Sequence, residues 1–316
     1  MKKNIFFVLV ASLIVGLLTF LTVKTTRLDD KVSLLARPAR LFTPSIIQSQ
    51  FEPRPEWQVK ISPEHDRFFY VVCQQTLYWL GRGAQAVVFE TQDGKYVVKF
   101  FQLGRLKEPS ERGFVKNLFS KESEGKRNER LSHREEIFLS SKMCYEELQE
   151  ETGIVYVHLN RTHDRIKGIK LVDKYGQSHR IRGDDASFVV QKKGKLLIPT
   201  LTQLMESGKI DEAKGRLNQV FDLLLGMARK NFVDGDDCLI RNNNLGLTED
   251  RAIYIDTGHI FRANNLDVLE RMKYEFQIRL EPLENWLKVL YPELSSYYRE
   301  RHDQIIAQLE QERKKG

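Results

Sequence analysis

Four aspartates in the second half of the chain stand where carboxylates could do chemistry. Asp234, Asp236 and Asp237 fall in a turn that follows a helical pattern, and Asp256 follows the apolar run 252–255 directly before a Thr-Gly pair. Carboxylates are seldom buried without a partner, so packing does not explain an aspartate at the end of a buried strand. Such groups can hold a metal ion. The alternative is an Asn/Asp-rich turn whose side chains bond to their own backbone.

A lysine in the first half of the chain is the second candidate. In the run 97–101, alternate residues share one face of a strand, so Lys99 lies on the same face as Val97 and Phe101. An ammonium that emerges from an apolar face calls for an anionic partner. The alternative is a surface lysine whose stem covers apolar residues while its charge reaches water.

The elements around Lys99 read as a small sheet. Aromatic and β-branched runs predict three antiparallel strands over 67–80, 87–91 and 96–101. The first corner carries Gly81 and Gly83, which by themselves indicate only a turn that needs positive φ.

Helices and further strands follow these three strands. A capping box of Ser132 and Glu135 predicts a helix that runs to about Glu151. Further strands are expected at 153–159, 166–181 and 187–191, and helices at 201–205, at 210–230 and over most of the chain after Gly258.

In this order the residues resemble the protein-kinase-like superfamily. Leu80, Gly81, Gly83 and Val88 match the LGxGxxxxV loop of the family, and 97–99 stands where the family has its VAIK-type strand. The resemblance implies that the loop covers the phosphates of ATP and that the strand lysine binds them. The sequence departs from the family at the third glycine of the loop, which is Ala86 here.

The aspartates extend the resemblance. Asp256, in IDTG, stands at the place of the DFG aspartate, and Asp236, in VDGD, resembles the VHGD form of the catalytic loop. The resemblance implies that Asp236 orients the attacking hydroxyl and that Asp256 holds Mg²⁺ together with an asparagine. The family interval counted from Asp236 falls on Arg241, whereas the interval counted back from Asp256 falls on Asn243 or Asn244. We assign Asn244.

The family also pairs its strand lysine with a glutamate on the following helix. Glu135 is used in capping, which leaves Glu136, Glu146 and Glu147. We assign Glu147 to Lys99 and to the nucleotide site.

A hydrophobic segment stands near the N-terminus. Residues 4–23 carry no charge, and twenty residues of helix span roughly 30 Å, enough to cross a bilayer. The run ends without a small-residue cleavage site, which favours an uncleaved anchor over a secretory signal. Basic residues flank both ends, so the side of the globular domain is not decided. An active kinase requires the cytoplasmic side.

The expected fold class is α+β, a protein-kinase-like two-lobed fold with an antiparallel sheet in the N-lobe and a mainly helical C-lobe behind one transmembrane helix. The expected divisions are the transmembrane helix 4–23, a Pro-rich linker 24–65, the N-lobe 66–193 and the C-lobe 194–316. Within the N-lobe, 105–134 has an excess of Lys and Arg and reads as an exposed insertion that could meet an anionic partner.

The predicted function is that of a single-pass membrane protein, divergent and kinase-like, that binds Mg²⁺ and ATP and transfers phosphate. The alternative is a pseudokinase that acts as a membrane-tethered binding module. A metal-dependent hydrolase lacks support because no HxH or HExxH spacing accompanies the aspartates. Nucleic acid is not an expected partner, because the basic residues are mixed with glutamates despite a net charge of +7. Three widely spaced cysteines do not form a disulfide framework.

Overall fold

The computed structural model describes residues 42–48, 52–102, 124–166, 168–235, 239–240 and 244–315, with backbone only for 124–133. The chain divides into two compact units, Met1–Thr43 and Pro44–Gly316. The helices and strands of the described residues all lie in the second unit.

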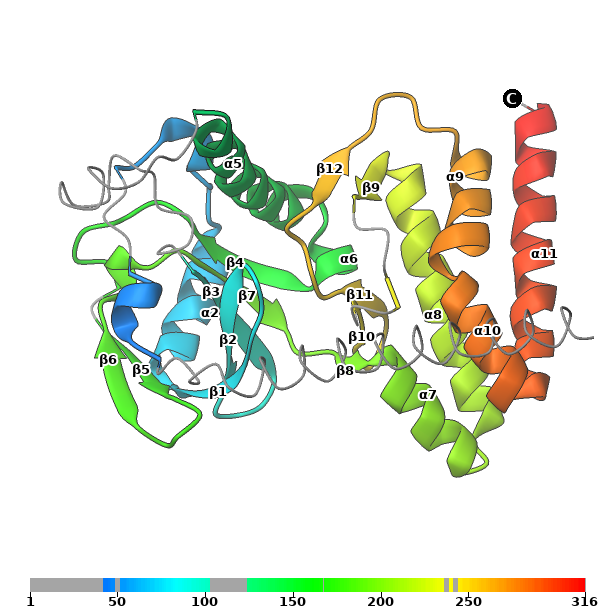
Figure 1. Ribbon diagram of the computed structural model, residues 1–316, viewed down its shortest axis with the longest axis horizontal. Helices are drawn as coiled ribbons and strands as arrows, with labels where there is room; N and C mark the ends of the chain where they lie inside the picture. Colours follow the sequence, from blue (N-terminus) through cyan, green and yellow to red (C-terminus); the bar gives the residue numbers. More distant parts are fainter. Residues whose placement is uncertain are drawn as a thin grey trace, which may run out of the picture. The chain divides into compact units, whose positions relative to one another are not determined.

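A seven-stranded sheet forms the N-terminal half of this unit, with the strand order β4-β7-β3-β2-β1-β5-β6 (Figure 1). The strands are β1 (Thr76–Arg82), β2 (Ala86–Thr91), β3 (Tyr96–Phe101), β4 (Ile154–His158), β5 (Ile169–Val172), β6 (Ser178–Ile181) and β7 (Phe188–Lys192). The hairpins β1–β2 and β2–β3 are antiparallel, as the sequence predicts.

The sheet is mixed, which corrects the expectation of an antiparallel one. Strands β4 and β7 extend the edge beside β3, and the β5–β6 hairpin pairs with the other edge, where β5 runs parallel to β1. An unpaired strand edge presents free backbone groups, and the added hairpin satisfies those of β1.

The aromatic run after Arg67 is a helix, not the start of the first strand as predicted. Helix α2 (Pro63–Gln74) begins with proline in its first turn, and the Ser62 side chain accepts a hydrogen bond from the His65 backbone N–H at 3.1 Å. Phe69 and Val72, three residues apart, are its buried residues. A capped start and helical spacing of the buried side chains outweigh the strand preference of β-branched residues.

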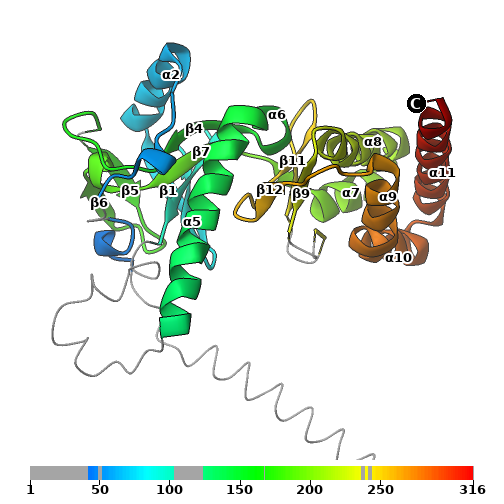
Figure 2. The same cartoon turned by 90° about the horizontal axis from the view of Figure 1, so that it is seen from above.

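Helix α5 (Glu124–Glu147) lies across the sheet and is followed by the short helix α6 (Gln149–Thr152), as Figure 2 shows. It begins before the predicted start at Ser132. Its buried residues Ile137, Phe138 and Cys144 follow the predicted helical spacing. The ring of Phe138 meets that of Trp57 edge to face at 4.9 Å.

The C-terminal half is mainly helical. Its helices are α7 (Leu197–Glu206), α8 (Ile210–Arg229), α9 (Val268–Tyr274), a π-helical turn (Glu275–Arg279), α10 (Glu281–Leu290) and α11 (Pro292–Lys315). Its short strands are β8 (Lys195–Leu196), β9 (Phe232–Asp234), β10 (Leu245–Leu247), β11 (Ala252–Tyr254) and β12 (Ile260–Arg262). Three 3-10 turns, Pro44–Ile46, Pro55–Trp57 and Gly183–Asp185, complete the unit.

The helix α8 is the centre of this half, because its buried side chains recur at helical spacing and belong to a core that continues into the sheet half. Strands β8, β10 and β11 form one small sheet, and β9 and β12 form another. The β10–β11 hairpin thereby lies where the chain passes from β7 through β8 into the helices.

None of the helices in the described part of the chain is both long enough and apolar enough to cross a bilayer. The segment 4–23 lies outside the described residues. On this finding we correct the expected transmembrane helix, the membrane contact through it and the single-pass membrane localisation. The fold class of the described chain is α+β with a mixed sheet.

Substitutions at two glycines, Gly183 and Gly215, can test the packing of this fold. A Cβ at Gly183 would lie 2.1 Å from Cγ2 of the buried Ile166, whereas one at exposed Gly215, in α8, would meet nothing within 4 Å. We expect Gly183→Ala to lower the free energy of unfolding by about 1 to 3 kcal/mol through overpacking. Gly215→Ala should raise it by about 0.5 to 1 kcal/mol, because alanine favours the helix. Urea denaturation of both variants measures the difference, and equal effects would contradict the described packing.

Candidate functional site

A cavity of about 670 Å³ lies between the glycine turn of the sheet and the segment that follows β11. Among its lining residues are Gly81, Gly83, Lys99, Asn244 and Asp256. The structure therefore brings together five of the residues singled out in the sequence, although they are spread over more than half of the chain. The volume is within the range of about 300 to 1,000 Å³ that is usual for small-molecule sites.

The side chain of Lys99 links the sheet to this segment. Lys99 sits in the middle of β3, paired with Val88 of β2 on one side and Val189 of β7 on the other. Its Nζ donates a hydrogen bond to the carbonyl oxygen of Ile255, the residue before Asp256. The ammonium is thus held close to Asp256, which follows the β10–β11 hairpin.

Burial lowers the pKa of Lys99 from its usual range to about 8, and the nearby Asp256 carboxylate acts in the opposite direction. Desolvation disfavours the charged form of an amine, while an adjacent negative charge favours it. Lys99 therefore carries its charge at neutral pH but releases its proton more readily than an exposed lysine does.

The segment from Ile255 to Ile260 is held by helix α5. The buried Ser140 hydroxyl donates to the carbonyl oxygen of Thr257 and accepts from the backbone N–H of Ile260 at 3.1 Å. The Asp256 carboxylate accepts a hydrogen bond from the Gly258 N–H at 3.2 Å. Ser140 thus fixes the backbone on both sides of Gly258. Because the Asp256 carboxylate is bonded to the Gly258 N–H, its orientation is fixed as well.

The glycine turn closes over the same segment. Gln85, at its tip, places its side-chain nitrogen 3.1 Å from Nε2 of His259. A Cβ at position 258 would lie 2.3 Å from Oε1 of Gln85, so the close approach depends on Gly258. The fully buried Gln102 holds the turn from below, because its side chain donates to the Gly83 carbonyl at 2.7 Å.

The structure places Glu147 away from the cavity, which corrects its assignment to Lys99. Glu147 stands in the last turn of α5, where it forms an ion pair with Arg262 of β12. The helix presents Ser141 to the cavity and Cys144 to the surroundings of Lys99. Helix α5 packs against β12, and its last residue, Glu147, reaches Arg262 on that strand.

Asp236 and Asp237 lie outside the described residues, but the structure describes their neighbour Asp234. The Asp234 side chain is 2% exposed and accepts a hydrogen bond at 2.5 Å from the equally buried Arg279, which also bonds to Glu275 at 2.9 Å. Buried charges persist when they are paired in this way. Asp234 is therefore structural, and it fixes the end of β9 two residues before Asp236.

Ser140 and Gln191 are residues of the site that the sequence analysis did not identify. Gln191 is almost fully buried and lines the cavity, and its side-chain nitrogen donates to the carbonyls of Thr152 at 2.6 Å and Tyr254 at 2.8 Å. It therefore joins β7 to α6 and β11. A glutamine inside the apolar strand SFVVQ was the available signal, because buried polar side chains need partners.

The side chains at the cavity fit a magnesium ion. Asn244 and Asp256 offer an amide and a carboxylate oxygen, and Mg²⁺ is typically held by one or two carboxylates together with phosphates and waters. The part of the chain that the structure describes contains no group of three or more His, Cys, Asp or Glu that could hold a metal by protein ligands alone. The arrangement therefore suits a metal that arrives with a phosphate ligand.

Solved structures similar to this chain include two of WbdD. No protein-family model matches the chain. No curated protein matches it either. A medium-resolution structure of the bifunctional kinase-methyltransferase WbdD is 16% identical over 73% of this chain and 50% of that one, with a TM-score of 0.33. A structure of monomeric WbdD is 18% identical over 70% and 48%, with a TM-score of 0.35. This chain spans about half the length of those proteins.

The role of Ser140 in holding the segment 255–260 can be tested by comparison with its neighbour Ser141. Ser140→Ala would leave the Thr257 carbonyl and the Ile260 N–H without their partner, so we expect a loss of about 1 to 3 kcal/mol in the free energy of unfolding. Ser141 bonds only to the carbonyl of Ile137 in its own helix, at 2.7 Å, and Ser141→Ala should cost less than about 1 kcal/mol. Denaturation curves distinguish the two, and equal losses would show that Ser140 does not hold the segment.

The pKa of Lys99 can be measured by competitive labelling. We expect its rate of reaction with an amine-selective reagent to reach half of its maximum near pH 8, because burial favours the neutral amine. In Asp256→Asn the midpoint should move lower, since the neighbouring negative charge is lost. Mass spectrometry of the labelled peptide reports both values. A midpoint near 10.4, about that of a free lysine, would contradict the described environment.

Proposed function

We propose that the chain is a divergent kinase-like protein that binds Mg²⁺ and ATP in this cavity and transfers the γ-phosphoryl group to an acceptor hydroxyl. One observation carries the proposal. The Lys99 ammonium from the sheet and the Asp256 carboxylate from the β10–β11 hairpin meet at one cavity, with Lys99 bonded to the carbonyl directly before Asp256. Phosphoryl transfer needs a cation for the phosphates and oxygen ligands for the metal at one site.

The remaining walls suit a nucleotide. Val88, Val97 and Leu196 give the cavity apolar surface, and the backbone at Lys193 and Gly194 passes beside them. An adenine ring could pack between these apolar side chains, with polar backbone groups of Lys193 and Gly194 near its edge. The glycine turn lies at the same cavity, where close approach of the backbone to phosphates requires small residues.

Lys99 would exchange one partner for another when a nucleotide binds. Its bond to the Ile255 carbonyl satisfies one of the three donors of the ammonium. Phosphate oxygens are charged acceptors, and charge-assisted hydrogen bonds are stronger than those to a neutral carbonyl. The phosphate would also raise the pKa of Lys99 above its present value of about 8, because a nearby negative charge favours the ammonium.

Asn244 and Asp256 would hold the metal ion, which when bound neutralises negative charge on the phosphates. Asp236 would accept a hydrogen bond from the acceptor hydroxyl and orient it. The buried pair of Asp234 and Arg279 anchors the strand from which Asp236 emerges. Ser140 and the Gly258 N–H keep the Asp256 segment in place during binding.

A nucleotide-binding module without transfer is the second candidate, and one observation favours it. Glu147 is engaged by Arg262, and α5 presents Ser141 to the cavity in place of an acid. The lysine–glutamate pair belongs to the active arrangement of protein kinases. The test must therefore separate binding from turnover.

Binding and turnover can be separated with three variants. Mg·ATP should raise the melting temperature of the wild type. Lys99→Met and Asp256→Asn should weaken apparent affinity about tenfold to hundredfold, because each loses a charged contact. Asp236→Asn should keep the thermal shift but lose at least about a hundredfold in phosphoryl transfer, measured as ADP release with a panel of hydroxyl acceptors.

Lys174→Met is the matched control, since Lys174 is an exposed lysine in the turn between β5 and β6 and lies over the Tyr175 ring at 4.7 Å. It should behave as the wild type does. A thermal shift unaffected by Lys99→Met and Asp256→Asn would refute the proposed site. A retained shift without any transfer in the wild type would favour the binding module.

A further inference from the structure

A second cavity, of about 630 Å³, lies between helix α2 and the β5–β6 hairpin. It shares no lining residue with the first. Three cationic side chains line it, from Arg165, Lys170 and Arg180, together with one carboxylate, Asp66. The proposed phosphoryl-transfer site makes no use of any of these residues.

The cations Lys170 and Arg180 face each other across the hairpin. They are direct cross-strand neighbours in the antiparallel pairing of β5 with β6, and both are exposed. Like charges in this position destabilise a sheet. Within the described residues neither side chain has a carboxylate partner, so the structure leaves their repulsion unopposed.

A glycine makes room for one of these cations. A Cβ at Gly168 would lie 2.7 Å from Nε of Arg180, so the guanidinium group occupies the space that a side chain would fill. The exposed side chain of Arg180 therefore lies across the start of β5, at the wall of the cavity.

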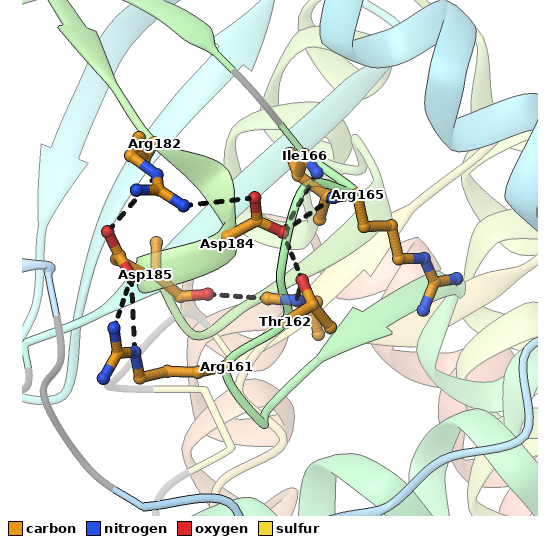
Figure 3. A network of polar contacts seen from close by, with 9 residues as sticks. Arg161, Thr162, Arg165, Ile166, Arg182, Asp184 and Asp185 are labelled. Carbon is orange, nitrogen blue, oxygen red and sulfur yellow. Dashed lines mark hydrogen bonds and ion pairs between the residues drawn. The ribbon is translucent and has the colours of Figure 1, made fainter.

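Arg165 is positioned by a buried carboxylate, as Figure 3 shows. Asp184 is 1% exposed, and its Oδ1 accepts hydrogen bonds from the backbone N–H groups of Ile166 at 3.0 Å and Arg165 at 3.2 Å and from the hydroxyl of Thr162. Burial acts to raise the pKa of Asp184, but these donors hold it below its usual value. The ionised carboxylate thus fixes the loop that carries Arg165.

The guanidinium of Arg165 is directed by Asp66 of α2, whose carboxylate accepts its hydrogen bond at 2.6 Å. This single acid offsets one of the three cations. Two positive charges remain at the cavity.

A buried hydroxyl group without a partner completes the wall. Tyr156 is fully buried and lines the cavity, and its ring stacks on Phe69 of α2 at 3.9 Å. Its hydroxyl has no hydrogen-bond partner among the described residues. Burial raises its pKa although Arg165 acts in the opposite direction, so the phenol keeps its proton and can donate it in a hydrogen bond. Buried polar groups are nearly always paired, so this hydroxyl calls for an explanation, and a ligand in the adjoining cavity would supply one.

We propose that this second cavity binds a small molecule that carries a phosphate monoester. The cations Arg165, Lys170 and Arg180 would contact its oxygens, and the Tyr156 hydroxyl would donate to one of them. A phosphate monoester carries a charge of about −1.5 to −2 at pH 7, which matches the two positive charges left after Asp66. The exposed ring of Tyr70 at the same cavity would cover the organic part of the ligand.

The test uses the full chain, with inorganic phosphate and phenyl phosphate as probes and sodium chloride of equal ionic strength as the reference. Calorimetry and thermal shift should show saturable binding, tighter for phenyl phosphate because its ring meets Tyr70. Arg180→Gln and Lys170→Gln should each weaken binding at least about tenfold, since each removes a charged contact. Lys174→Gln, in the turn of the same hairpin, should leave binding unchanged.

Tyr156→Phe separates a ligand contact from a structural role. The variant should bind phenyl phosphate several-fold more weakly while the free protein is as stable as the wild type or more so, because an unpaired buried hydroxyl has been removed. A loss of stability in the free protein would show that the hydroxyl has a partner in the fold and would overturn its assignment.

The variant Lys99→Met shows which of the two cavities binds phenyl phosphate. Phenyl phosphate should bind this variant as tightly as it binds the wild type, because the two cavities share no residue. Equal binding by wild type, Arg180→Gln and Lys170→Gln, or binding lost in Lys99→Met, would overturn the proposal. So would the lack of any saturable response beyond that to sodium chloride.

Discussion

The hydrogen bond between the Lys99 ammonium and the Ile255 carbonyl is the interaction on which the arrangement of the site depends. It joins the middle of the sheet to the residue before Asp256 across 156 positions of the chain. Ser140 holds the same segment from helix α5. Because three elements from the sheet, the helix and the hairpin converge there, the segment has little freedom to move independently of them.

Buried polar side chains fix contacts both between the two halves of the molecule and within the C-terminal half. Gln191 connects β7 to the carbonyls of α6 and β11, and Arg279 connects Asp234 at the end of β9 to Glu275. Each is nearly excluded from water. Removing one member would leave its partners buried and unpaired, which is costly, so these residues specify how the hairpins meet the helices.

The two cavities differ in how their charges are balanced. At the first, Lys99 faces Asp256, whose negative charge partly offsets the desolvation of the ammonium. At the second, three cations meet one carboxylate, and two of them oppose each other across a hairpin. Lys99 thus has an acid beside it, whereas Lys170 and Arg180 have each other, although the residues that line each cavity include more cations than carboxylates.

The sequence by itself determined β2, β3 and the buried face of α5, because periodicity is a local property. The resemblance to the kinase-like order of residues pointed to Gly81, Gly83, Lys99, Asn244 and Asp256, and the structure places these five residues at one cavity. The sequence analysis misassigned most of α2 as a strand, because the aromatic and β-branched run 68–72 is also typical of strands. Only the tertiary structure decided that Glu147 pairs with Arg262, that Asp234 is buried against Arg279 and that β5 pairs in parallel with β1. These outcomes depend on which distant elements meet, and the partner of a charged side chain is set by that meeting and not by its neighbours in the chain.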